Sequence, residues 1–328
     1  MTRSRSGVVP MRPAGDRPRG LTAKDYLSVL NLSHDELADV LDLAAQLKRD
    51  RHAGRLGMQP LAGKHVALLF EKPSLRTRST FTIAIRELGG QTIEPDADVA
   101  LGSRETVEDV ARNLERWVGV AVVRTFAQAR LERFAAAAAS LHVVNALTDE
   151  EHPCQALADI LTLQEHLGSV AGRTLTFVGD GNNVATSLAH AGAMLGMHVR
   201  IASPKGFELP QAVVDESRAV AAHGATIEVM NDPIAAVKGA DAIYTDVWTS
   251  MGQEAESTTR DRAFHGYQVN GAMMAATGAK TFFMHCLPAH RGAEVTNEVM
   301  DSPASVVFDQ AENRLHVQKA LLALLVRP

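Results

Sequence analysis

Apolar residues recur along the chain with two spacings, which predict strands and helices in alternation. Short continuous apolar runs such as Val120-Ala121-Val122-Val123 are typical of parallel strands that are covered on both faces. Such runs predict strands at 65–70, 120–124, 142–145, 174–178, 198–202, 226–230, 241–245, 281–285 and 305–308. Helical spacing appears over 37–47 after the capping residue Ser33, over 153–167, and over about 311–326. The alternation predicts an α/β fold.

We expect two doubly wound parallel-sheet domains joined by helices, because 328 residues are enough for two hydrophobic cores. The first domain is predicted over 21–150 and the second over 151–310, with Pro153 at the first position of the helix that links them. The final helix, within 311–328, is expected to return to the first domain. Residues 1–20 combine Arg with Gly, Pro and Ser and predict a disordered tail. Their prolines disfavour the amphipathic helix of a transit peptide.

Composition narrows the classes of function. A formal net charge of −5 argues against broad nucleic-acid binding, which needs a basic face. Cys154 and Cys286 are the only cysteines, so no disulfide framework is expected and a reducing, cytoplasmic compartment is the default. No apolar run approaches the length of a membrane span, so no membrane association is expected.

The turn that follows the strand at 65–70 has unusual chemistry. Ser74 is predicted to cap the next helix, whose buried face begins at Phe81. Arg76 and Arg78 lie in the same turn, although cations are disfavoured at the positive end of a helix dipole. Backbone N–H groups, a hydroxyl and guanidinium groups would together bind a phosphate there. A capped surface helix with two solvated arginines would explain this stretch equally well.

Four motifs resemble those of the aspartate/ornithine carbamoyltransferase family, and the similarity extends from about Leu21 to the end of the chain. Ser-x-Arg-Thr-Arg at 74–78 is similar to the family's carbamoyl phosphate motif. The segments His-Pro-Cys-Gln at 152–155 and His-Cys-Leu-Pro-Ala at 285–289 agree in order and spacing. Asp-Val-Trp-Thr-Ser-Met-Gly at 246–252 resembles the substrate loop of the ornithine-specific members.

The resemblance implies roles at a carbamoyl phosphate site. The phosphate would be bound by the turn Ser74, Leu75, Arg76 and Thr77, and by Arg124 and Arg314. Arg124 would also reach the carbonyl oxygen, to which His152 would donate a hydrogen bond. The carbamoyl NH₂ would be held by the amide oxygen of Gln155 and the backbone carbonyl of Leu287, with Cys286 nearby. Without the resemblance, each arginine could be a salt-bridged surface residue, His152 a helix cap and Gln155 an exposed residue.

A second set of residues is implied for L-ornithine. Asp246 would hold the amine that attacks, while Asn183, Ser250 and the Met251 backbone would bind the amino-acid end. Cys286 is expected to orient this amine and to form no covalent intermediate. An inert buried thiol is the alternative for Cys286. Arg124, His152, Asp246 and Cys286 are therefore the predicted catalytic residues.

The chain departs from the family pattern at two positions. Many relatives have Thr or Gly where this chain has Leu75, and backbone contacts would survive that change. The segment 96–101 falls where the family loop reaches into the site of a neighbouring subunit. Ala100 stands where many ornithine-specific members have Gln or His, and Ser103 or Arg104 lies close enough to substitute.

The activity implied is transfer of the carbamoyl group of carbamoyl phosphate to L-ornithine by direct attack through a tetrahedral intermediate, in a homotrimer, with no cofactor and no metal. The biosynthetic and degradative directions are left open.

Acetylornithine, putrescine or aspartate could instead be the acceptor, although the 246–252 loop favours an α-amino acid. A nicotinamide oxidoreductase is disfavoured because Val184 replaces the third glycine of the fingerprint that begins at Gly179. A non-catalytic binding protein would be expected to lack part of the set of site residues.

Overall fold

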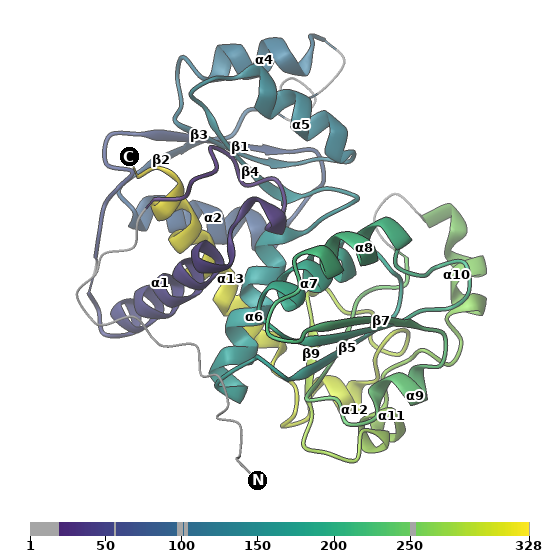
Figure 1. The fold of residues 1–328 in the computed structure, drawn as a ribbon. Coiled ribbons are helices and arrows are strands. Elements are labelled where there is room, and N and C mark those ends of the chain that lie inside the picture. The colour runs from purple at the N-terminus through teal and green to yellow at the C-terminus, as the bar shows by residue number, and fades with distance from the viewer. Residues whose placement is uncertain (1–19, 56, 97–100, 102–103, 250–253, 328) are drawn as a thin grey trace.

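The structure, a computed structural model, describes residues 20–55, 57–96, 101, 104–249 and 254–327. Its strands form two sheets in which every pairing is parallel (Figure 1). The first sheet contains β1 (His65–Phe70), β2 (Gln91–Ile93), β3 (Val120–Arg124) and β4 (His142–Leu147). The second contains β5 (Thr174–Val178), β6 (His198–Ala202), β7 (Thr226–Met230), β8 (Ala242–Thr245) and β9 (Phe282–His285). The predicted fold class is confirmed.

Each sheet reverses its direction of winding once. The strand order is β2-β1-β3-β4 in the first sheet and β7-β6-β5-β8-β9 in the second. The reversal therefore lies between β1 and β3 in one sheet, and between β5 and β8 in the other. The crevice outside the carboxyl ends of such a pair of strands is where open α/β sheets bind ligands. The crevices at these two reversals are therefore the expected positions of a ligand-binding site.

Helices cover both faces of each sheet (Figure 1). In chain order the helices are α1 (His34–His52), α2 (Leu75–Glu87), α4 (Val107–Leu114), α5 (Gln128–Ala137), α6 (Pro153–Leu167), α7 (Asn183–Met194), α8 (Gln211–Ala219), α9 (Pro233–Val237), α10 (Ser257–Ala263), α11 (Gly271–Ala276), α12 (Asn297–Met300) and α13 (Val307–Leu325). The described residues also form two 3₁₀ turns, η1 (Val29–Asn31) and η2 (Glu254–Glu256).

One hydrophobic core runs continuously from the first sheet to the second. Alternate residues of the central strands, such as Val66 and Leu68 of β1, pack against the helices between the sheets. The opposite residues, Ala67 and Leu69, face a separate core under α4 and α5. Helix α13 packs against α1, α2 and α6, so the C-terminal helix returns to the first sheet as predicted (Figure 1).

Most predicted elements are confirmed within one or two residues, with one clear error. The apolar run at 305–308 is not a strand. Ser305 makes a single bridge to Phe283, and Val307 already begins α13, four residues before its predicted start. A short apolar run cannot distinguish a strand from a buried helical turn. The edge strand β2 was missed because its three residues are largely polar and partly exposed.

The predicted disordered tail, 1–20, falls almost wholly outside the described residues. Within the described part of the chain, no helix combines the length and the apolar character needed to cross a membrane.

Candidate active site

A cavity of about 770 Å³ opens between the carboxyl edges of the two sheets. Its walls come from both halves of the chain. The first half contributes the turn 74–77 after β1 and Arg124 at the end of β3. The second contributes Asn182 after β5, Asp246 after β8 and Cys286 after β9. Residues that follow the carboxyl ends of strands in both sheets therefore converge on one cavity.

The turn after β1 is built as a helix N-terminus. The Ser74 side chain accepts a hydrogen bond from the Thr77 N–H and caps α2, as predicted. Leu75, the first residue of α2, is 80% exposed. Thr77 is fully buried, and its hydroxyl accepts a hydrogen bond of 2.5 Å from Arg314 on α13. The free N–H groups of the first turn and a positive helix end therefore face the cavity.

Guanidinium groups gather above this turn, and within the described residues neither Arg124 nor Arg314 forms an ion pair with a carboxylate. Arg124 and Arg314 are 9% and 3% exposed, and their Nε atoms have no hydrogen-bond partner in the described chain. Burial, together with the charges of Arg314 and Arg76, lowers the pKa of Arg124 to about 10. Neither Arg124 nor Arg314 is a salt-bridged surface residue, which was the alternative. Burying guanidinium groups without a counter-charge costs free energy, so this arrangement favours the binding of an anion.

His152 lies behind the guanidinium groups at the N-cap position of α6. Its side chain caps no backbone group, so the capping alternative is wrong. The backbone N–H donates to Ser187 Oγ over 3.0 Å, while the 5% exposed ring leaves Nδ1 without a partner in the described chain. Burial, and then the charges of Arg314 and Arg124, hold the pKa of His152 well below its ordinary value. At neutral pH the ring is therefore a neutral donor.

Gln155 is completely buried, so the alternative of an exposed residue is wrong. Its Nε2 donates to Asp159 Oδ1 over 2.8 Å, which leaves the amide Oε1 without a partner in the described chain. Asp159 also accepts from Gln310, whose amide oxygen accepts the backbone N–H of His285. Gln155 is absent from the cavity lining. A chain of side-chain hydrogen bonds thus joins α6, α13 and the end of β9 behind the cavity.

Asp246 and Cys286 form the opposite wall. The Cys286 thiol donates to Asp246 Oδ1 over 3.0 Å, and Asn182 donates to Oδ2 over 2.8 Å. Burial and the Asp246 carboxylate raise the pKa of Cys286 well above its ordinary value. The thiol is therefore protonated at neutral pH, which is unsuited to a nucleophile. Asn183 also lines the cavity, although its amide donates to the Thr148 carbonyl.

Leu287 lines the cavity in a constrained backbone conformation, with φ of 59°. Its N–H donates to His285 Nδ1 over 2.9 Å, and His285 Nε2 contacts Glu294 Oε1 at 3.2 Å. Asp246, His285 and Cys286 place possible metal-ligand atoms within 4.8 Å of one another. Both nitrogens of His285 are already engaged, however, so this group of three is not a free metal site.

Two charged pairs at the cavity were not predicted from sequence. Lys72 pairs with Asp149 and lies 4.4 Å from the centre of the Phe126 ring. Its place inside the phosphate-type turn was an available signal. Arg260, on α10, pairs with Asp180 over 2.7 Å, and nothing in its sequence context pointed to the site. Ser250, Met251, Ala100 and Ser103 lie outside the described residues, and Arg104 is exposed.

Known proteins share both halves of this architecture. The carbamoyl-P binding domain of aspartate/ornithine carbamoyltransferase matches residues 24–165, and its Asp/Orn binding domain matches 171–325. An ornithine carbamoyltransferase from Parasynechococcus marenigrum is 51% identical over 307 residues, which cover 93% of this chain and 95% of that protein. The solved structure of the Pyrococcus furiosus ornithine carbamoyltransferase has a TM-score of 0.89 and 45% identity, covering 93% and 97% of the two chains. The solved structure of the Thermus thermophilus ornithine carbamoyltransferase has a TM-score of 0.83 and 45% identity, and the match covers 93% of this chain and 99% of that chain.

Proposed function

The chain belongs to the aspartate/ornithine carbamoyltransferase family, and we propose that it transfers the carbamoyl group of carbamoyl phosphate to the δ-amino group of L-ornithine, giving L-citrulline and phosphate. One observation carries the proposal. A single cavity has, on one wall, guanidinium groups that form no ion pair with the described residues and, on the other, a carboxylate–thiol pair. The first wall suits a doubly charged phosphate and the second a cationic amine, so two oppositely charged substrates would meet between them.

The phosphate group would lie at the N-terminus of α2. Backbone N–H groups of Leu75 and Arg76 would donate to its oxygens, with the Ser74 and Thr77 hydroxyls beside them. Arg124 and Arg314 would balance its charge, since both are buried and neither forms an ion pair with a carboxylate of the described residues. Residues 21–150, with the C-terminal helix, would form this half of the site, and 151–310 the ornithine half.

The carbonyl oxygen of the carbamoyl group would be polarised by Arg124, Thr77 and His152. These donors are fixed before the reaction and would stabilise the charge that grows as the carbon becomes tetrahedral. Because His152 is neutral, its donor would persist across the physiological pH range. The free Oε1 of Gln155 and the Leu287 carbonyl would accept from the carbamoyl NH₂.

L-Ornithine would be held through Asp246, with Asn183, Ser250 and the Met251 backbone at its amino-acid end. The δ-amine must lose a proton before its lone pair can attack the carbonyl carbon. The tetrahedral intermediate would then collapse with cleavage of the C–O bond to phosphate, which leaves as the proton acceptor. Cys286 would orient the amine through the hydrogen bond that it shares with Asp246.

We further propose a homotrimer in the cytoplasm, with no cofactor. Support for the trimer is the family resemblance of the 96–104 segment, which in relatives reaches a neighbouring site. Light scattering coupled to size exclusion would test it, because a monomer or dimer of full activity would contradict the proposal.

The activity is tested by measuring product from carbamoyl phosphate with L-ornithine, acetylornithine, putrescine and aspartate in parallel. Citrulline from L-ornithine alone would support the whole assignment. Turnover with another acceptor would retain the phosphate half and overturn the role given to Asp246. No turnover with any of the four would overturn the proposed transfer.

A further inference from the structure

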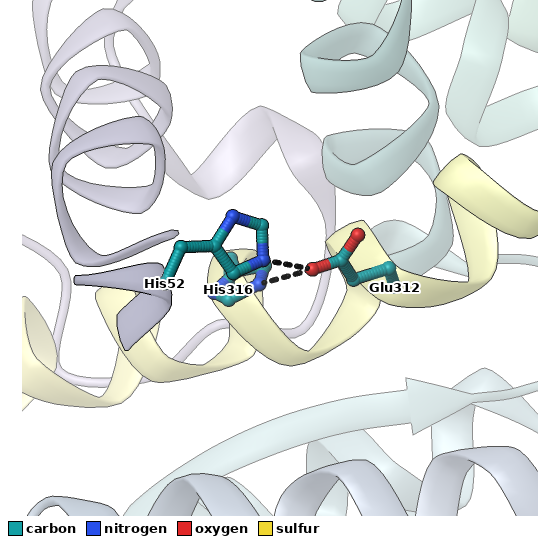
Figure 2. Close-up of side chains that lie close together, drawn as sticks. All are labelled: His52, Glu312 and His316. Carbon is teal, nitrogen blue, oxygen red and sulfur yellow. Dashed lines mark hydrogen bonds and ion pairs between the residues drawn. The ribbon is translucent and has the colours of Figure 1, made fainter. Parts of the chain in front are cut away.

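A group of three possible metal ligands lies outside the cavity, where α1 meets α13. His52 is the last residue of α1, and Glu312 and His316 lie one turn apart on α13. Figure 2 shows both imidazoles directed at the same carboxylate oxygen, Glu312 Oε1. His52 Nε2 is 2.8 Å from that oxygen and His316 Nε2 is 3.4 Å from it. All three ligand atoms lie within 4.8 Å of one another.

We propose that His52, Glu312 and His316 bind a Zn²⁺ ion. Two imidazole nitrogens and one carboxylate oxygen are ligands that Zn²⁺ accepts with three protein contacts and a water molecule. Zinc bonds of about 2.0–2.2 Å at a tetrahedral angle place ligand atoms about 3.3 Å apart. The two separations from Glu312 Oε1, 2.8 and 3.4 Å, bracket that value. The pair at positions i and i+4 is fixed by the helix, and the half-exposed His52 is free to adjust.

The charges around the three ligands determine how tightly we expect the site to bind Zn²⁺. Lys48 Nζ lies 3.7 Å from Glu312 Oε2, but it also pairs with Glu165 at 2.9 Å, which offsets its charge. Arg51 is a second cation close enough to act on His316. His316 Nδ1 has no hydrogen-bond partner in the described chain, so the outer support typical of tight zinc sites is lacking. We expect an affinity of about 1–10 μM, weaker than that of structural zinc sites.

The site differs from the one at Asp246 and Cys286, and the test separates them. Three untagged proteins are compared: wild type, His52→Ala and Glu312→Gln. Each is stripped of metal with a chelator and then titrated with Zn²⁺ by calorimetry. His52 is exposed, so His52→Ala removes a ligand without opening the core. His265→Ala, at an exposed histidine of the other half, is the matched control.

We expect His52→Ala and Glu312→Gln each to weaken Zn²⁺ binding at least about tenfold, while His265→Ala binds as wild type does. Zn²⁺ should also raise the thermal midpoint of wild type and not that of His52→Ala. Co²⁺ should give visible bands without a thiolate charge-transfer band. Equal affinity in wild type and His52→Ala would overturn the proposal. A thiolate band unaffected by His52→Ala would place the ion at Cys286 and would also overturn it.

Discussion

The thiol of Cys286 lies 3.0 Å from Asp246 Oδ1 and donates a hydrogen bond to it, although the two residues follow different strands of the second sheet. This contact defines the chemistry of the wall opposite the proposed phosphate site. A thiol that donates to a carboxylate is stabilised in its protonated form, because the thiolate would be repelled by the same carboxylate. Cys286 therefore resembles an orienting donor more than a nucleophile.

Slow alkylation is the first prediction from this contact. We expect iodoacetamide to label Cys286 at least about tenfold more slowly than glutathione at pH 8, because the thiolate fraction is small. Asp246→Asn should accelerate labelling, since it removes the charge that helps to raise the thiol pKa. Mass spectrometry of the peptide gives the rates, and Asp215→Asn is the exposed control. Labelling as fast as that of glutathione would contradict the assignment.

Arg124→Ala should separate activity from stability. We expect turnover to fall by about 10³-fold or more, because a donor to the developing oxyanion is lost. The thermal midpoint without ligand should not fall, since the substitution removes a buried cation that is repelled by Arg314. Steady-state kinetics and thermal unfolding measure the two effects. Arg262→Ala, at an exposed arginine, should change neither, and near-normal turnover in Arg124→Ala would remove that residue from the site.

Leu75→Thr should have little effect, despite its place in the phosphate turn. The Leu75 side chain is apolar and 80% exposed, so it has no donor for the phosphate, and only the backbone N–H would bind it. We expect kcat, and KM for carbamoyl phosphate, to change by less than about threefold. Thr77→Val is the contrast, because it removes the hydroxyl that accepts from Arg314. A change of tenfold or more in Leu75→Thr would show that the side chain contacts the substrate.

Asp159 should make stability depend on pH. Burial raises the pKa of Asp159 to about 7, against the hydrogen bonds from Gln310 and Gln155 that lower it. Because the folded pKa exceeds the unfolded value of about 3.9, this group favours the folded state at low pH. That contribution is lost as pH rises from about 4 to about 7, by up to about 4 kcal/mol.

Asp159→Asn, which cannot ionise, should remove this dependence. The urea midpoint of the variant, relative to wild type, should be higher at pH 8 than at pH 5. Asp215→Asn is the control, since it alters an exposed carboxylate. If the urea midpoint of the variant relative to wild type is the same at pH 5 and pH 8, Asp159 does not titrate as the structure indicates.

The sequence by itself determined most of the elements and indicated the residues of the proposed phosphate half of the site. Apolar runs and the Ser74 cap are local features, so β1, α2 and most other elements were predictable within one or two residues. The motifs at 74–78, 152–155 and 285–289 also identified which residues to examine. The prediction of a strand at 305–308 was wrong because a stretch of four apolar residues does not show whether its period is that of a strand or of a helix.

Only the tertiary structure decided which residues meet and in what state. Strand order depends on packing over long sequence separations, so the two reversals of winding could not be derived from local patterns. The same applies to Arg260 beside Asp180 and to His52 beside His316, which lie far apart in the sequence. Burial and neighbouring charges together lower the pKa of His152 and raise that of Cys286, and both depend on everything packed around a group.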